Sequence, residues 1–252
     1  MNLLTLIENG FTKYVYTSRG WKLLAEKDEI LVFENDNKIV MKYGFSTIYS
    51  ILDKRSIYTH SYFDYFLPLA YLYESPRILM IGIGGGTILL QLNKLFGDKI
   101  QIDAVDVNKD IVDMAKKYFL SAVKANIYIA DGAQYVSGKK NQYDIIILDA
   151  FKGSSIPEQF FEQTFIDNVS AALTDNGILA INTDMYDKHL EPFREKLEKF
   201  FKVYKFRTSL FDWNVIVICS KKFDREYIVN TMRASMPKTE DNKFIFMKYE
   251  EL

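Results

Sequence analysis

The chain has 252 residues, of which 48% are hydrophobic, so it can bury a large core in one α/β domain or in a domain with a small appendage. Its net charge of −1 provides no overall field that would attract nucleic acid or an anionic membrane. The single cysteine, Cys219, excludes an intramolecular disulfide. The sequence has no basic leader and no apolar stretch long enough to span a bilayer. We therefore expect a cytoplasmic protein without membrane or nucleic-acid partners.

The first 57 residues differ from the rest of the chain. Two apolar segments, EILVFE at 29–34 and KIVMKYGF at 38–45, flank a turn-forming Asn-Asp-Asn sequence, and TIYSIL at 47–52 predicts a further strand. We therefore expect a small antiparallel β-unit over residues 1–57 and a main domain over residues 58–252.

Strands and helices are predicted to alternate along the main domain. An aromatic segment at 61–74 favours a helix that Pro68 bends or restarts. Continuous apolar runs predict strands buried on both faces at 77–82, 99–107, 126–131, 143–151 and 177–183. Helical patterns lie between and after them at 87–96, 109–120, 157–173 and 191–201, with a turn at Asn176-Gly177. This alternation predicts an α/β fold with a mostly parallel sheet and helices on both faces.

The last part of the chain is less regular. Residues 202–208 and 213–222 predict a closing hairpin, and residues 224–236 favour a helix. The segment KFIFMKY at 243–249 is interpreted as a strand of its own or as an arm on a neighbouring subunit.

Four glycines follow the first main-domain strand: Gly82, Gly84, Gly85 and Gly86. Glycine permits a tight turn with positive φ, and it also lets a ligand approach the backbone directly. Asp106 lies 20 residues after Gly86, at the end of the next strand, where a carboxylate can accept hydrogen bonds from ribose hydroxyls. The alternatives are a tight turn without a ligand and a solvated carboxylate.

Asp131 and Gly132 end the third strand, where a short carboxylate would meet the amino group of an adenine. The alternative for Asp131 is the N-cap of a helix that begins at Ala133. The pattern G-x-G-G-G lacks the G-x-G-x-x-G spacing of dinucleotide sites, and no Gly-Lys-Ser/Thr of a nucleoside-triphosphate loop is present. The sequence therefore favours an adenosyl sulfonium ligand.

In combination, these segments resemble the spermidine synthase family, within the class I S-adenosylmethionine-dependent methyltransferase fold. The resemblance covers residues 47–220 and is carried by ILMIGIGGGT (78–87), IDAVDVNKDIVDMAKKYF (102–119), IYIADGAQYV (127–136), YDIIILDAF (143–151), IPEQFFEQTFIDNVSAAL (156–173) and NGILAIN (176–182). It implies a Rossmann-like domain with a seven-stranded, mostly parallel sheet, a small N-terminal β-unit and a homodimer.

The resemblance also implies roles for individual residues. The donor would be S-adenosylmethionine or its decarboxylated form, and it would contact the glycine loop. Asp106 and its neighbour Val107 would contact the ribose, and Asp131 and Gly132 would contact the adenine. Asp149 would face the reacting centre, and Tyr62 lies near the family's substrate-pocket tyrosine. Asp149 and Tyr62 are therefore the candidate catalytic residues, with Asp64 as a further candidate general base.

Two positions depart from the aminopropyl-transferring members of this family. Those members carry an aspartate inside the glycine loop, where this chain has Gly85, and another aspartate three residues after the strand-end aspartate, where this chain has Lys152. Such carboxylates attract the cationic aminopropyl arm and the polyamine acceptor, whereas a lysine repels a polyamine. S-adenosylmethionine carries a carboxylate on this arm, so Lys152 is expected either to pair with it or to point into solvent.

These departures favour methyl transfer from S-adenosylmethionine to a small-molecule acceptor. The alternatives are aminopropyl transfer from decarboxylated S-adenosylmethionine to a polyamine, and a non-catalytic protein that binds an adenosyl ligand. With only His60 and His189, far apart in the sequence and without a cysteine partner, no metal site is expected.

Overall fold

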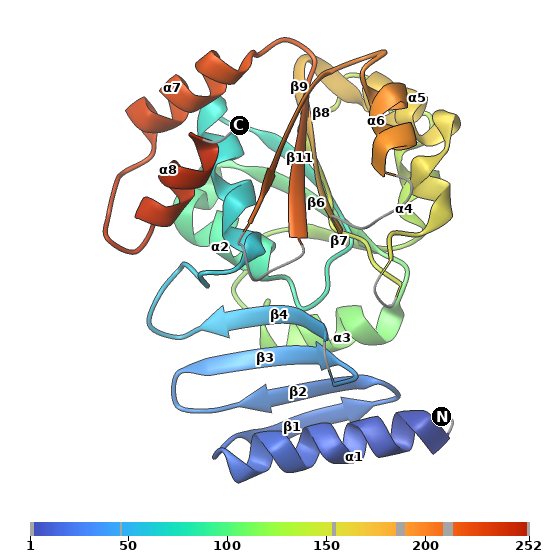
Figure 1. Ribbon diagram of the computed structural model, residues 1–252, viewed down its shortest axis with the longest axis vertical. Coiled ribbons are helices and arrows are strands. Elements are labelled where there is room, and N and C mark those ends of the chain that lie inside the picture. Colours follow the sequence, from blue (N-terminus) through green and yellow to red (C-terminus); the bar gives the residue numbers. More distant parts are fainter. Residues whose placement is uncertain (1–2, 46, 153–154, 185–189, 209–213, 251–252) are drawn as a thin grey trace.

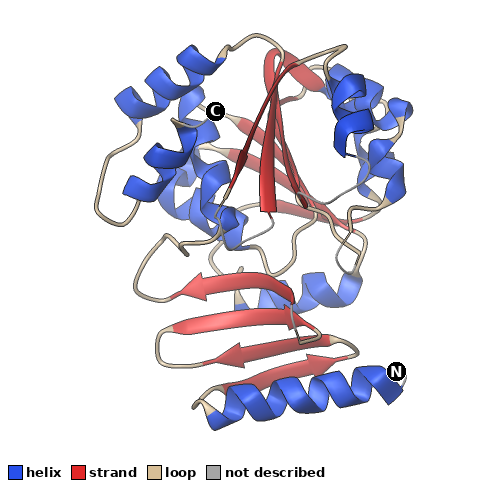
Figure 2. Ribbon diagram, viewed as in Figure 1, coloured by secondary structure: helices blue, strands red, loops and turns tan. Residues whose placement is uncertain are grey.

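The computed structural model describes residues 3–45, 47–152, 155–184, 190–208 and 214–250. Its N-terminal part is a helix, α1 (Leu3–Ser18), followed by an antiparallel meander of four strands (Figures 1 and 2). The strands are β1 (Lys22–Lys27), β2 (Ile30–Glu34), β3 (Lys38–Tyr43) and β4 (Thr47–Asp53). The predicted antiparallel unit is confirmed, and α1 and β1, which the sequence did not predict, precede the three predicted strands.

The second sheet has seven strands in the order β10-β11-β9-β8-β5-β6-β7, and only β11 runs antiparallel to its neighbours. The strands are β5 (Arg77–Ile81), β6 (Gln101–Asp106), β7 (Asn126–Ile129), β8 (Tyr143–Leu148), β9 (Leu173–Asp184), β10 (Lys202–Arg207) and β11 (Asn214–Ser220). Alternate residues of β5 enter two separate cores: Ile78 and Met80 pack on one face, and Leu79 and Ile81 on the other. This burial on both faces produces the continuous apolar runs in the sequence, and it confirms the Rossmann-like fold.

The helices cover both faces of the large sheet. Helices α2, α7 and α8 contribute to one core, and α4, α5 and α6 contribute to the other, on the opposite side of the sheet in Figure 1. The helical elements are η1 (Tyr62–Leu72), α2 (Thr87–Phe96), η2 (Gly97–Lys99), α3 (Lys109–Tyr118), α4 (Gly132–Val136), η3 (Glu158–Phe161), α5 (Gln163–Ala172), α6 (Leu190–Leu197), α7 (Arg225–Ser235) and α8 (Lys243–Tyr249). Helix α3 also contacts the small sheet, since the Tyr118 hydroxyl donates to the Leu24 carbonyl at 3.1 Å.

Several predicted elements differ in detail. The aromatic segment forms a 3₁₀ helix with Pro68 inside it, and the helix predicted over 157–173 is divided into η3 and α5 at Glu162. The turn predicted at Asn176-Gly177 lies within β9, because the register jumps from Tyr143↔Leu173 to Ile145↔Ile178 and the extra residues form a bulge. The predicted strand at 243–249 is α8, whose buried residues recur with helical spacing.

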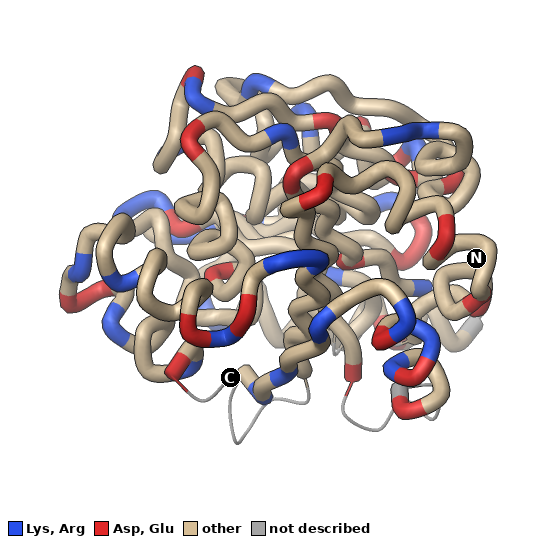
Figure 3. Tube along the Cα trace, turned by 90° about the horizontal axis from the view of Figure 1, so that it is seen from above, with Lys and Arg blue, Asp and Glu red and all other residues tan. Residues whose placement is uncertain are grey.

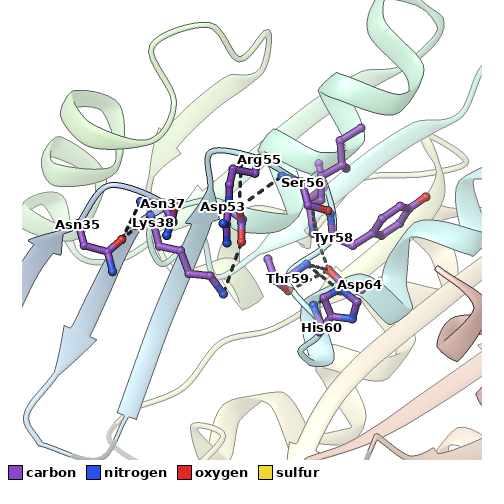
Figure 4. Close-up of polar contacts among 12 residues, drawn as sticks. Asn35, Asn37, Lys38, Asp53, Arg55, Ser56, Tyr58, Thr59, His60 and Asp64 are labelled. Atoms are coloured by element: carbon purple, nitrogen blue, oxygen red, sulfur yellow. Dashed lines mark hydrogen bonds and ion pairs between the residues drawn. The ribbon is translucent and has the colours of Figure 1, made fainter. Parts of the chain in front are cut away.

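The segment that joins the two sheets is fixed by a carboxylate at each end (Figure 4). Asp53 Oδ1 accepts hydrogen bonds from the backbone N–H groups of Arg55 and Ser56, at 2.9 and 3.3 Å. Asp64 is fully buried and accepts from the N–H groups of Thr59 and His60. Burial raises the pKa of Asp64, and these hydrogen bonds oppose that rise. A boundary between residues 57 and 58 would fall in this segment and stays a prediction.

No helix among the described residues is both long and apolar enough to span a membrane. Lys and Arg residues are interspersed with Asp and Glu along the chain, as Figure 3 shows, and the net charge is −1.

Helix α8 offers a direct test of the C-terminal packing. Tyr249 is fully buried and donates to the Tyr65 carbonyl at 2.6 Å, whereas Met247 on the same helix is exposed. We expect Tyr249→Ala to lower the free energy of unfolding by roughly 3 kcal/mol or more, since it opens a cavity and removes a buried hydrogen bond. Met247→Ala is the control and should change it by less than about 0.5 kcal/mol. Urea unfolding measures both, and equal effects would mean that α8 is not docked as described.

Candidate active site

The predicted site residues meet at the carboxyl ends of the parallel strands. Strand β5 lies between β8 and β6, so the chain order reverses beside it, which is where ligands bind in open α/β sheets. The backbone ladder continues past the strand ends, because Gly82 N–H donates to the Val105 carbonyl and Asp149 N–H donates to the Ile81 carbonyl, both at 2.9 Å. The glycine loop, Asp106 and Asp149 are thereby held side by side.

The four glycines of the loop are closely surrounded by the protein itself. A Cβ atom at any of them would lie within 3 Å of another segment: 2.3 Å from the Asp149 carbonyl at Gly82, 2.7 Å from the Tyr49 carbonyl at Gly84, 2.7 Å from Ser50 Cβ at Gly85, and 2.5 Å from Leu120 Cδ2 at Gly86. Gly82 also has φ of +86°, which a side chain would strain. Internal packing therefore requires these glycines, and contact of the loop with a ligand stays a prediction.

Strand β4 lies against this loop and fixes it by side-chain hydrogen bonds. Gly85 N–H donates to Ser50 Oγ at 2.6 Å. The Thr87 hydroxyl accepts from Ile51 N–H at 2.8 Å and donates to the Ile51 carbonyl at 3.0 Å. Ser50 and Thr87 were not predicted as site residues, since nothing in the local sequence indicates that the small sheet reaches the loop.

Asp106 is partly buried and binds the loop backbone. Its Oδ2 accepts from Ile83 N–H and its Oδ1 accepts from Asn108 N–H, both at 2.9 Å. Burial raises the pKa of this carboxyl group, and the N–H groups of residues 83, 108, 84 and 107 oppose the rise. Ribose hydroxyls would have to share Asp106 with these donors. The neighbouring Val107 side chain is exposed.

Asp131 is the N-cap of helix α4, which was the alternative to adenine binding for this residue. Its Oδ1 accepts from Gln134 N–H at 2.9 Å and caps α4, and its Oδ2 accepts from the Gln159 side chain at 3.1 Å. Gly132 packs on Ile81, which a Cβ would approach to 2.3 Å. Asp131, Gln134 and Gln159 line a hollow of about 320 Å³, whose lining includes no residue of the glycine loop. Adenine binding at Asp131 stays a prediction.

The structure brings the two candidate catalytic residues together. Asp149 follows β8, and its Oδ2 accepts from the Tyr62 hydroxyl, at the start of η1, at 3.3 Å. Its Oδ1 accepts from Asn182 Nδ2 at 2.8 Å, and Asn182 Oδ1 accepts in turn from Asn214 Nδ2 at 2.8 Å. Asn182 is buried, and sequence analysis did not assign it a role. The signal was there, because Asn182 and Thr183 are polar residues at the end of an apolar strand.

Burial has a large effect on Asp149. It raises the pKa of this carboxyl group to about 6, although the hydrogen bonds from Asn182 and Tyr62 act in the opposite direction. A carboxylate with a pKa close to physiological pH is a better proton acceptor than an ordinary aspartate. The arrangement is therefore suited to general-base chemistry beside the glycine loop.

The remaining candidates have other surroundings. Lys152 is exposed, and its backbone N–H donates to the Ser155 carbonyl at 2.9 Å. Asp64 is occupied by structural hydrogen bonds, as described above. No cluster of three or more His, Cys, Asp or Glu residues able to hold a metal occurs in the described part of the chain, and His189 lies outside that part. Cys219 is buried, and burial raises the pKa of its thiol.

Comparison with known families agrees with this geometry. The profile of the spermine/spermidine synthase domain matches residues 65–235, which include β5 to β11 and the whole glycine loop. The chain belongs to the spermine/spermidine synthase family. It is 32% identical over 153 residues to a polyamine aminopropyltransferase of Vibrio vulnificus, covering 56% of this chain and 51% of that protein. The chain thus spans about half the length of the curated relatives it matches.

Solved structures show the same fold. A spermidine synthase in complex with the transition-state analogue AdoDATO superposes with a TM-score of 0.63, at 23% identity over 90% of this chain and 88% of that one. A probable spermidine synthase from Corynebacterium glutamicum superposes with a TM-score of 0.69, at 15% identity over 89% of this chain and 93% of that one. At these identities the likeness establishes the architecture, and function has to be argued from the site.

The contact between Gly85 and β4 can be tested by a rescue experiment. Gly85→Ala places a methyl group against Ser50, and we expect it to lower the free energy of unfolding by about 1–3 kcal/mol. Ser50→Gly removes the clashing atoms, so the double variant should lose less than the sum of the two single variants. Chemical denaturation of the four proteins measures this coupling. Strict additivity would contradict the contact.

Proposed function

We propose that this protein is an aminopropyltransferase that uses decarboxylated S-adenosylmethionine as donor and a polyamine or diamine as acceptor. The observation that carries the proposal is the Asp149 carboxylate, at the tip of β8, with its raised pKa and its hydrogen bonds to Tyr62 and Asn182. The relatives named polyamine aminopropyltransferase support this reaction over methyl transfer, which the sequence alone had favoured.

The reaction needs a proton acceptor at this position. The donor supplies a carbon activated by a sulfonium, so that the new C–N bond forms as the C–S bond breaks and its electron pair passes to sulfur, leaving a neutral thioether. The attacking amine must lose one proton, and the Asp149 carboxylate would accept it. Tyr62 and Asn182 would orient the carboxylate toward the amine and hold it in the ionised form.

The donor would be held by groups at neighbouring strand ends. Asp106 would accept hydrogen bonds from the ribose together with the loop N–H groups. Asp131 would meet the adenine amino group if the Gln159 side chain, which donates to it at 3.1 Å, moves aside. The glycine loop would lie beside the sulfonium, and no metal ion is required by this chemistry.

Methyl transfer from S-adenosylmethionine is the second candidate, and one observation favours it. The position that carries a carboxylate in aminopropyl-transferring members is Gly85, where Ser50 leaves no room for a side chain. The other such position is Lys152, an exposed cation. A donor that bears its own carboxylate would lose nothing from these two changes and would gain a possible partner in Lys152.

A donor-exchange experiment separates the candidates. The protein is incubated with 1,4-diaminobutane and either decarboxylated S-adenosylmethionine or S-adenosylmethionine, and the acceptor is analysed by mass spectrometry. We expect the acceptor to gain one aminopropyl group with the decarboxylated donor only. A gain of one methyl group with S-adenosylmethionine would overturn the proposal in favour of methyl transfer. Binding of a donor, measured by calorimetry, without transfer to the acceptor would indicate a non-catalytic protein.

The pH dependence of the reaction tests the role of Asp149. The carboxylate is charged above its pKa of about 6 and takes up a proton below it, so the single-turnover rate should fall as the pH decreases through about 6. Asn182→Ala removes a hydrogen bond that lowers this pKa, and it should shift the acid limb of the profile to higher pH. Asn126→Ala, an exposed asparagine of β7 that bonds Asp103, is the matched control and should leave the limb in place. An acid limb that Asn182→Ala does not move would exclude Asp149 as the titrating base.

A further inference from the structure

Helix α1 packs on the small sheet through its polar side chains. Thr5, Asn9 and Thr12 are buried. The Thr5 hydroxyl donates to Glu29 Oε1 at 2.9 Å, and Asn9 Nδ2 donates to the Asp28 carbonyl at 2.7 Å. Tyr16, at the end of this face, makes apolar contacts: it stacks on Phe33 with ring centroids 4.5 Å apart and meets the edge of Trp21 at 5.4 Å. The inner face of α1 is therefore unusually polar for a helix that covers a sheet.

The opposite face of α1 is apolar and exposed. Leu4, Ile7, Phe11 and Tyr14 form a stripe, here called the α1 stripe, with exposed fractions between 53% and 70%. This is the reverse of an ordinary surface helix, which turns its apolar stripe to the core. The residues are spaced three, four and three positions apart, as in the seam of a coiled coil.

The exposed surface extends beyond the helix. Phe45, after β3, is also exposed and contacts Phe11 with ring centroids 4.9 Å apart. A fully accessible large apolar side chain covers roughly 200 Å², so the α1 stripe and Phe45, each about half exposed or more, present on the order of 500 Å². Single exposed apolar residues need no explanation, but a continuous patch of this size does.

Gly10 lies on one flank of the α1 stripe, and no neighbouring atom of the described structure requires a glycine there. A Cβ atom there would meet nothing within 4 Å. A glycine inside a helix costs about 1 kcal/mol relative to alanine. Its absence of a side chain would allow the backbone of a second helix to approach closely.

We propose that the α1 stripe pairs antiparallel with the same stripe of a second copy of this chain. Residues 4 and 14, and likewise residues 7 and 11, are symmetric about residue 9, so a twofold axis there sets each apolar side chain opposite another. Antiparallel pairing also aligns the helix dipoles favourably. A membrane surface fits this stripe less well than a second copy, because membrane-binding helices carry several cations that attract anionic lipids. Helix α1 has one cation, Lys13, and it is paired with Glu26 at 2.9 Å.

Sedimentation of the full-length chain tests this proposal. We expect the unmodified protein to be a dimer at micromolar concentration and Phe11→Glu to weaken association by about 100-fold or more, since a charge would be buried at the centre of the interface. Met247→Glu adds the same charge at an exposed apolar position of α8 and should leave the dimer intact. Circular dichroism shows whether each variant is folded.

A cross-linking variant gives a positive readout. Gly10→Cys should form an intermolecular disulfide under mild oxidation, whereas Met247→Cys should not; Cys219 is buried and does not interfere. A monomeric unmodified protein, or a dimer that Phe11→Glu leaves intact without cross-linking at residue 10, would overturn the proposal. If the protein is a monomer that binds phosphatidylserine vesicles, the patch is a membrane-binding surface. If it is a monomer that does not bind them, the patch is assigned to a different protein partner.

Discussion

The contact between β4 and the glycine loop is the interaction on which the rest of the site depends. Ser50 and Thr87 tie the small sheet to the loop by hydrogen bonds, and a Cβ atom at Gly84 or Gly85 would lie 2.7 Å from an atom of β4. The loop is thus fixed by its own protein before any ligand arrives. Such preorganisation would reduce the entropic cost of binding the proposed donor.

The same edge of the sheet concentrates acidic groups whose charges are controlled in different ways. Asp106 is surrounded by backbone N–H groups, which are fixed donors, and it serves to shape the loop. Asp149 has two side-chain donors and stays partly neutral near pH 6. A carboxyl group with few fixed donors can exchange a proton easily, whereas one held by the main chain is suited to recognition.

The sequence was sufficient to predict the large sheet, because strands buried on both faces have continuous apolar runs. The resemblance also named Asp149 and Tyr62 as candidate catalytic residues; the structure places them in hydrogen-bond contact, and their catalytic roles stay predictions. The sequence did not predict α1, because pattern rules assume that a helix turns its apolar residues toward the core. In α1 the polar residues face the sheet instead. Ser50 and Asn182 were missed for another reason: their importance comes from packing between distant segments, which a single strand does not reveal. Helix α8 was predicted as a strand because its short apolar run fits both the strand period and the helix period.

The Gly85–Ser50 contact limits how the sequence of this protein can change. An acidic residue at position 85 would clash with Ser50 unless β4 shifts, so we expect the residue types at positions 50 and 85 to depend on each other. A smaller residue would have to arise at position 50 first, as a permissive step that brings no benefit of its own. The side chain that the loop can carry at position 85 is therefore tied to the docking of the N-terminal sheet.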